Sequence, residues 1–250
     1  MLAKRIIAAL DIKNGRVVKG VRFRNIQEVG TAVKFARKYE EQGADEIVFL
    51  DISASLEKRK ILAKLAREVA SVIFIPFTVG GGIACLEDAV EIIRNGADKI
   101  FINTAAVENP RLIKEIAKVI GKANLVVAID AKWNGEFWEV FIYSGSKPTG
   151  LCAIEWAKVA ERKGAGEILL TAIDRDGTQK GFSVELIKQV RDAVSIPIIA
   201  SGGAGRPEHF YEAFIAGADA ALAASILHYG KYTIADIKRY LRRRGVNARI

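Results

Sequence analysis

Two aspartates end apolar segments at matching places in the two halves of the sequence. Asp11 ends the segment RIIAALD at 5–11, and Asp130 ends the segment NLVVAID at 124–130. A carboxylate among apolar neighbours is costly to keep charged, so two such residues need a reason to be there. Paired carboxyl groups can act as general acid and general base, and we expect that chemistry of Asp11 and Asp130. Capping a helix or bracing a loop is the alternative for each.

Two glycine-rich segments also follow apolar segments. They read IPFTVGGGI at 75–83 and IPIIASGGAG at 196–205, so their Ile-Pro pairs lie 121 positions apart. Glycine lets backbone N–H groups approach an anion closely, and a following helix N-terminus adds partial positive charge. We therefore predict two phosphate sites, and a ligand with two phosphates, although tight turns without a ligand are the alternative. The sites comprise Gly80, Gly81, Gly82, Asn103 and Thr104, and Ser201, Gly202, Gly203, Ala224 and Ser225.

Other residues are expected at the same end of the strands. Asp51, Asp174 and Asp176 follow strand-like segments, and the turn DRDGT at 174–178 can offer the Gly177 N–H to phosphate while Asp176 organises the loop. The long, basic segment at 11–30, which contains Lys19, is expected to form a mobile lid over an anionic substrate. A surface excursion is the alternative for that segment.

These residues need a scaffold, and the sequence predicts a (β/α)8 TIM barrel formed by one domain over 1–250. Short segments rich in Ile and Val, typical of strands buried on both faces, alternate with amphipathic segments. Eight such units in about 250 residues favour a closed barrel over a doubly wound sheet. The expected strands are 5–11, 46–52, 74–79, 98–103, 124–130, 167–172, 196–200 and 218–223, and the expected helices are about 31–42, 58–71, 85–95, 109–120, 152–163, 183–194, 206–216 and 233–244.

The chain also repeats itself. QGADEIVFLDI at 42–52 matches KGAGEILLTAI at 163–173, and NGADKIFINTA at 95–105 matches AGADAALAASI at 216–226, both at an offset of 121. One offset that serves separate segments indicates two half-barrels, at about 1–120 and 121–250. The repeat places Asp11 and Asp130 across the barrel mouth from each other.

The opposite end of the barrel is expected to carry charge. Four predicted strands begin with a charged residue, and inward-pointing side chains there would form a ring of two cations and two anions. Ordinary solvated strand ends are the alternative. The four residues are Arg5, Glu46, Lys99 and Glu167.

Composition excludes several classes of protein. The 38 Lys and Arg against 29 Asp and Glu give a net charge of +9, but the basic residues are scattered without interleaved aromatic residues, so nucleic-acid binding is not expected. No apolar run reaches the roughly 18 residues of a membrane helix, so a cytoplasmic protein is expected. With only Cys85, Cys152, His209 and His228 as soft ligands, no metal site is expected, and the cysteines are interpreted as small buried residues.

Several motifs together resemble one family over essentially the whole chain. AKRIIAALDIKNGRVVKG, FLDISAS, PFTVGGGI, INTAAVENP, AIDAK, IDRDGT and IASGGAG are similar to the cyclase subunit of imidazole glycerol phosphate synthase, from histidine biosynthesis. The resemblance implies a lyase that takes ammonia and the bisphosphorylated intermediate PRFAR and forms imidazole glycerol phosphate and AICAR. It implies no cofactor, and a separate glutaminase subunit at the N-terminal face of the barrel that supplies ammonia as its partner in a heterodimer.

The resemblance also implies roles for single residues. Asp11 and Asp130 match the catalytic pair, Lys19 the basic residue of the first loop, and Asp98 an acid near the glutaminase interface. The phosphate sites match Gly82, Asn103 and Thr104, and Asp176, Gly177, Gly203 and Ser225, while Arg5, Glu46, Lys99 and Glu167 match a gate for ammonia.

One departure and two rivals qualify the resemblance. Ala9 stands where family members often carry Cys, and we expect this core change to leave the chemistry intact. The sister isomerase of the same pathway shares the repeat, the phosphate sites and the opposed aspartates, but the KRI start, LDISAS and the complete charged ring favour the cyclase. A non-catalytic scaffold that binds bisphosphates would show binding without turnover.

Overall fold

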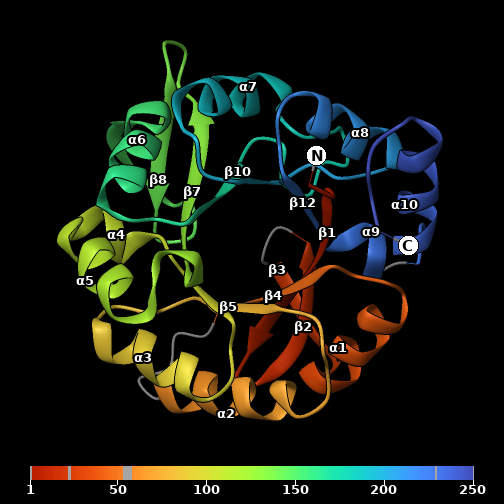
Figure 1. The fold of residues 1–250 in the computed structure, drawn as a ribbon, viewed down its shortest axis with the longest axis horizontal. Coiled ribbons are helices and arrows are strands. Elements are labelled where there is room, and N and C mark those ends of the chain that lie inside the picture. The colour runs from red at the N-terminus through yellow and green to blue at the C-terminus, as the bar shows by residue number, and fades with distance from the viewer. Residues whose placement is uncertain (1, 22–23, 53–57, 229, 250) are drawn as a thin grey trace.

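The computed structural model describes residues 2–21, 24–52, 58–228 and 230–249, and these form a closed barrel of eight parallel strands inside a ring of helices (Figure 1). β1 pairs with β12 and β4, and β7 pairs with β6 and β10, which closes the sheet and confirms the predicted fold class. The barrel strands are β1 (Arg5–Lys13), β4 (Glu46–Asp51), β5 (Phe77–Gly80), β6 (Lys99–Ile102), β7 (Leu125–Trp133), β10 (Glu167–Ala172), β11 (Ile198–Ser201) and β12 (Ala220–Ala223).

The outer helices agree with the predicted ones to within a few residues. One start differs by two residues: α5 begins at Arg111 with Pro110 as its N-cap, whereas the sequence predicts a helix from about 109. None of the described helices is long and apolar enough to cross a membrane. The helices are α1 (Ala32–Glu41), α2 (Lys58–Ala70), α3 (Leu86–Arg94), α5 (Arg111–Ile120), α6 (Ala153–Lys163), α7 (Val184–Ala193), α8 (Pro207–Ile215) and α10 (Ile234–Arg243), with short turns at α4 (Thr104–Glu108), η1 (Lys122–Asn124) and α9 (Ser225–His228).

Two antiparallel hairpins extend the barrel beyond the prediction. β2 (Arg16–Val21) and β3 (Arg24–Thr31) continue from β1, so much of the expected lid at 11–30 is a β-ribbon. β8 (Trp138–Ile142) and β9 (Lys147–Cys152) continue from β7 in the same way. Each hairpin follows the strand that carries one of the two aspartates.

The interior of the barrel is a small apolar cluster separate from the larger core between strands and helices. Its residues come from opposite strands, such as Ile7 on β1 and Val126 on β7, and so can meet only inside the barrel. The strands therefore bury both faces, as the near-continuous apolar segments predict. The cluster consists of Ile7, Val48, Phe101, Val126, Ala128, Leu169, Ile199 and Ala220.

The expected strand 74–79 begins three residues late, at Phe77. The N–H groups of Phe74 and Ile75 donate to Glu40 Oε1 at 2.6 and 3.1 Å instead of to a strand, and Pro76 has no N–H to donate. The second half repeats this contact 121 positions later: Glu161 Oε1 accepts from Ser195 and Ile196 N–H at 2.9 and 3.2 Å.

A second pair of contacts repeats at the same offset. Asp98 Oδ2 accepts from Phe77 N–H at 2.9 Å, and Asp219 Oδ2 accepts from Ile198 N–H at 3.1 Å. Both carboxylates thus satisfy the first backbone donor of a barrel strand. Hydrogen bonds that recur with the sequence repeat support the division into half-barrels, which stays a proposal.

A buried ion pair joins the last helix to the start of the barrel. Lys238 on α10 and Asp45 are 3% and 7% exposed, and Lys238 Nζ lies 2.7 Å from Asp45 Oδ1. The other oxygen, Asp45 Oδ2, accepts from Ile6 N–H at 2.8 Å. Asp45 therefore fixes α10 against β1.

We predict that Asp45→Asn lowers the free energy of unfolding by about 3 kcal/mol at neutral pH, because it leaves the Lys238 ammonium buried without a counter-charge. Guanidinium titration followed by circular dichroism measures the change. Arg249→Gln is the control, because Arg249 is exposed and its Nε lies 3.9 Å from Asp45. Equal stability of wild type and Asp45→Asn would contradict the prediction.

Candidate functional site

The two predicted aspartates lie on opposite sides of the barrel mouth. Asp11 on β1 is the register partner of Leu50, and Asp130 on β7 is the partner of Thr171. Four strand-to-strand steps separate β1 from β7 in either direction around the barrel, so the two carboxyl groups face each other across it. Their elements thus place them as the repeat predicts.

The pKa values of both carboxyl groups are raised toward neutral pH. Burial raises the pKa of Asp11 to about 6, and the nearby charge of Asp176 adds to the effect. Burial also raises the pKa of Asp130 to about 6, against opposing hydrogen bonds from Thr171 and Asn103. Since Asp176 acts on both residues, the three carboxyl groups share one electrostatic environment. Such perturbed pairs are typical of acid–base sites.

Asn103 links Asp130 to the first predicted phosphate site. Its Nδ2 donates to Asp130 Oδ2 at 2.8 Å, and its Oδ1 is buried with no hydrogen-bond partner in the part of the chain that the structure describes. The next residue, Thr104, begins α4 and accepts at Oγ1 from Tyr143 N–H at 2.9 Å. The turn after β8 is therefore fastened beside this site.

The glycines of this first site are required by close packing. A Cβ at Gly81 would lie 2.2 Å from the Asp51 carbonyl oxygen, and one at Gly80 would enter the Phe101 ring. Gly81 and Gly82 also have φ angles of 97° and 74°, which L side chains rarely adopt. Only glycine allows the chain to leave β5 along this path.

The second site repeats the constraint 121 positions later. A Cβ at Gly202 would lie 2.7 Å from the Ala172 carbonyl oxygen, just as a Cβ at Gly81 would collide with the Asp51 carbonyl oxygen. A Cβ at Gly203 would lie 2.2 Å from the Gly181 carbonyl oxygen, and Gly181 N–H donates to the Gly203 carbonyl at 2.8 Å. Ser201 ends β11, while Ala224 and Ser225 stand where β12 leads into α9. All the predicted glycines thus gather at one barrel end.

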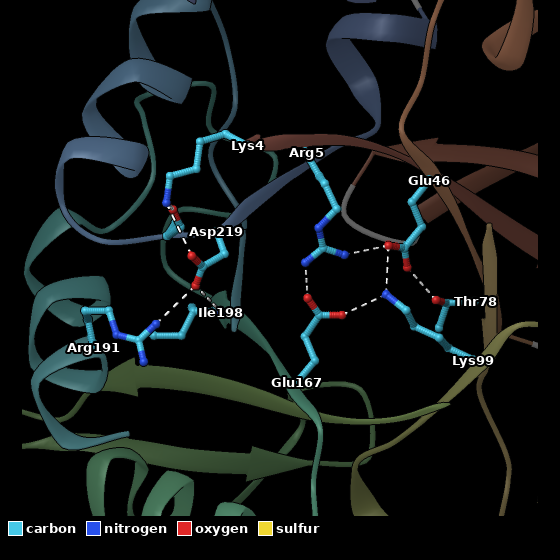
Figure 2. A network of polar contacts seen from close by, with 10 residues as sticks. Lys4, Arg5, Glu46, Thr78, Lys99, Glu167, Arg191, Ile198 and Asp219 are labelled. Atoms are coloured by element: carbon cyan, nitrogen blue, oxygen red, sulfur yellow. Dashed lines mark hydrogen bonds and ion pairs between the residues drawn. The ribbon is translucent and has the colours of Figure 1, made fainter. Parts of the chain in front are cut away.

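A closed ring of ion pairs fills the opposite end (Figure 2). Arg5 bonds both Glu46, at 2.7 Å, and Glu167, and Lys99 Nζ lies 2.9 and 3.0 Å from the same two carboxylates. Thr78 Oγ1 donates to Glu46 at 2.6 Å. Glu46 and Glu167 are 1% and 4% exposed, so solvated strand ends are the wrong interpretation of these residues.

The chain matches known proteins over its full length. A model of the family described as "Histidine biosynthesis protein" matches residues 5–233. The "Imidazole glycerol phosphate synthase subunit HisF" of Pyrococcus furiosus is 65% identical over 250 residues, covering 100% of both chains. The proteins of the same name from Thermococcus onnurineus and Petrotoga mobilis are 64% and 58% identical, covering 100% of this chain and 99% and 100% of theirs. The chain belongs to this family, which confirms the resemblance.

Some family-derived assignments look different in the structure. Gly177 N–H donates to the Asp176 carboxylate, so it is engaged within the loop, and the role of Asp176 as organiser of that loop stays a prediction. Lys19 lies in β2 opposite Gln27, within the hairpin. Asp51 is buried at the end of β4, while Asp174 is exposed.

The structure also bears on the predictions of buried cysteines and of no metal site. Neither Cys85 nor Cys152 forms a disulfide bond within the described residues, and both are only partly buried, so the expectation of buried cysteines is wrong in degree. Among the described residues, no group of three or more His, Cys, Asp or Glu could hold a metal ion. Residues 53–55 of the FLDISAS motif lie outside the described residues.

Sequence reasoning missed two residues that support the segments predicted to bind phosphate. Tyr143 N–H binds Thr104, and the buried His209 accepts at Nδ1 from Gly205 N–H at 3.1 Å. Burial, reinforced by the charge of Arg206, lowers the pKa of His209 and keeps the acceptor nitrogen available. A tyrosine does not indicate a positive φ, so the φ of 52° at Tyr143 could not be predicted from the sequence. A single histidine on a helix could not be assigned a role, because most such residues are ordinary packed side chains.

We predict that Asp11→Asn and Asp130→Asn each raise the free energy of unfolding at pH 8, by at most about 3 kcal/mol. A carboxyl whose folded pKa is raised from 3.8 to about 6 stabilises the fold fully below pH 3.8 and loses that contribution as pH rises through 6. Denaturant titrations at pH 4 and pH 8 should therefore show a smaller gain at the lower pH. A gain that is equal at both would contradict this.

Proposed function

We propose that the chain is the cyclase subunit of imidazole glycerol phosphate synthase and converts PRFAR and ammonia into imidazole glycerol phosphate, AICAR and water. The observation that carries the proposal is the pair Asp11 and Asp130, both with pKa values near 6, between two glycine-constrained segments at one barrel mouth. Two phosphate sites on opposite sides suit a substrate with a phosphate at each end. The names of the full-length relatives support the same activity.

The chemistry requires repeated proton transfers. Ammonia attacks the carbonyl of the ribulosyl arm, and loss of water leaves an imine. Ring closure then forms the imidazole, and cleavage of the N–C bond releases AICAR. A carboxyl with pKa about 6 can give a proton in one step and take one in the next at neutral pH, so Asp11 and Asp130 can serve these transfers in turn.

The charged ring is proposed as the entrance for ammonia. Arg5, Glu46, Lys99 and Glu167 span the barrel at the N-terminal ends of their strands, and the apolar interior cluster lies between them and the aspartates. Neutral ammonia crosses an apolar interior at less cost than ammonium does. The barrel axis therefore offers a path from one face to the other.

The glutaminase subunit is proposed to dock at that same face. Phe74 and Val119, which precede strands at this end, are 98% and 57% exposed, and exposed apolar side chains gathered on one face are typical of interfaces. Asp98 lies there too. Its repeat partner Asp219 is paired with Lys4 and Arg191, whereas no described cation lies within ion-pair distance of Asp98. Asp98 is therefore available for an ion pair with a cation of the glutaminase subunit. A cytoplasmic location stays a prediction.

We predict that the purified chain turns over PRFAR with an ammonium salt at alkaline pH without any glutaminase, and that Asp11→Asn and Asp130→Asn each lower kcat by a factor of about 100 or more. Product identification by chromatography is the measurement. Asp192→Asn is the control, because Asp192 is an exposed residue of α7. Isomerisation of the PRFAR precursor without cyclisation would assign the chain to the sister isomerase, and binding without turnover would indicate a scaffold.

We predict that Glu167→Gln uncouples the cyclase reaction from the ammonia that the glutaminase releases. Removing one charge leaves Arg5 and Lys99 with a single carboxylate, so the ring no longer holds its closed arrangement. With glutaminase bound, the glutamine-driven rate should fall by a factor of about 10, while the rate with added ammonia changes little. Lys4→Gln alters the neighbouring network around Asp219 and is the control (Figure 2). An equal loss with both nitrogen sources would contradict a role in passage.

A further inference from the structure

A basic groove runs between α5 and α6 on the outer wall of the barrel. Its cavity has a volume of about 700 Å³ and is lined by five cations around an apolar floor. The lining residues of this basic groove are Lys114, Ala117, Lys118, Lys122, Val159, Arg162, Lys163 and Gly164.

The helices meet closely enough to fix the shape of this groove. A Cβ at Gly164 would lie 2.9 Å from Ala117 Cβ, so the glycine permits the close approach of α6 to α5. Lys114 and Lys118 lie one turn apart on one side of α5, and Lys122 lies in η1 just beyond the end of α5 at Ile120. All three line the cavity, so they form a row of lysines along the groove.

The charges of the basic groove lack internal compensation. None of its five cations is in an ion pair with a described residue, and no carboxylate lines it. Two nearby acids are used elsewhere: Glu155 pairs with Lys158 at 2.7 Å, and Glu161 binds the backbone before β11. Glu115 on α5 forms no ion pair with a described residue and does not line the groove. Like charges four residues apart on a helix destabilise it. An anionic partner would remove the repulsion between these lysines.

The repeat shows that the fold does not require all of this charge. At the offset of 121, Arg162 and Lys163 correspond to Glu41 and Gln42, and Lys114 corresponds to Ala235. Lys118 and Lys122 correspond to the cations Arg239 and Arg243. The equivalent place in the other half-barrel thus carries two cations and one acid where the basic groove carries five cations.

The basic groove opens at the face where the glutaminase is proposed to dock. Lys122 and Lys163 lie in or beside the connections that lead into β7 and β10, so they stand at the same barrel end as Lys99 and Glu167. Val119, exposed by 57%, is on the same helix as Lys118. The groove therefore continues that face up the outer wall.

We propose that the basic groove binds an acidic segment of the glutaminase subunit, an inference that rests on the proposed function. A short extended segment fits a cavity of about 700 Å³, and several Asp or Glu side chains there would meet the five cations. The lining offers no aromatic side chain for base stacking, so an acidic peptide suits it better than a single-stranded nucleic acid. Rim charges of this kind act mainly on the rate of association.

The test compares two variants that each remove three positive charges. Lys114→Gln, Lys118→Gln and Lys122→Gln together neutralise the row, and Lys34→Gln, Arg37→Gln and Lys188→Gln together are the matched control on α1 and α7. Association with the glutaminase of the same organism is followed by stopped-flow fluorescence from 20 to 500 mM salt, values that span about 20 to 4 Å in screening length.

We expect the groove variant to associate about 10-fold more slowly at low salt and with a weaker salt dependence, and the control to remain within about 2-fold of wild type. Ammonia-driven turnover should be equal in all three proteins, which shows that the barrel is intact. Equal association rates for groove variant and control would overturn the inference, as would a groove variant that loses only heparin or RNA binding. A wild-type chain without cyclase activity or glutaminase binding would instead refute the proposed function.

Discussion

Closure of an all-parallel sheet is the constraint on which the rest of this molecule depends. Because β1 pairs with both β12 and β4, every strand has two neighbours and no edge is left among the eight barrel strands. All strands then end on one face and begin on the other. Residues near the carboxyl ends of strands, such as Asp11 and Asp130, are thereby brought to one face, although more than 100 positions separate them in sequence. Strand topology alone thus places the two aspartates on one face and the ring of ion pairs on the other.

Burial has opposite consequences at those two faces. At the mouth, Asp11 and Asp130 lose solvent without an ion pair to any cation in the described part of the chain, and their pKa values rise to about 6. At the other end, Glu46 and Glu167 are more deeply buried, yet each meets both Arg5 and Lys99. Pairing offsets part of the desolvation cost that the aspartates keep. One fold thus holds a carboxyl pair with raised pKa values and a closed ion-pair ring at opposite ends of its strands.

Sequence reasoning recovered whatever depends on strand ends and on the repeat. The positions of Asp11, Asp130 and the glycines follow from periodicity, because strand direction determines where such residues lie. It did not recover contacts made by side chains far apart in sequence. The Tyr143 contact with Thr104 depends on a turn with positive φ, and the bond from Gly205 to His209 depends on how α8 packs. Pattern alone also could not separate a closed charged ring from four solvated strand ends.

The repeat supplies a comparison within one molecule, because equivalent backbones carry different side chains. Asp98 and Asp219 both hold the first N–H of a barrel strand, so the structural duty is the same. Only Asp219 also meets Lys4 and Arg191. The shared backbone geometry of the two halves does not require differences of this kind. Asp98, which no described cation pairs, and the larger number of cations between α5 and α6 lie in adjoining parts of the barrel, on the side where one asymmetric partner is proposed to dock.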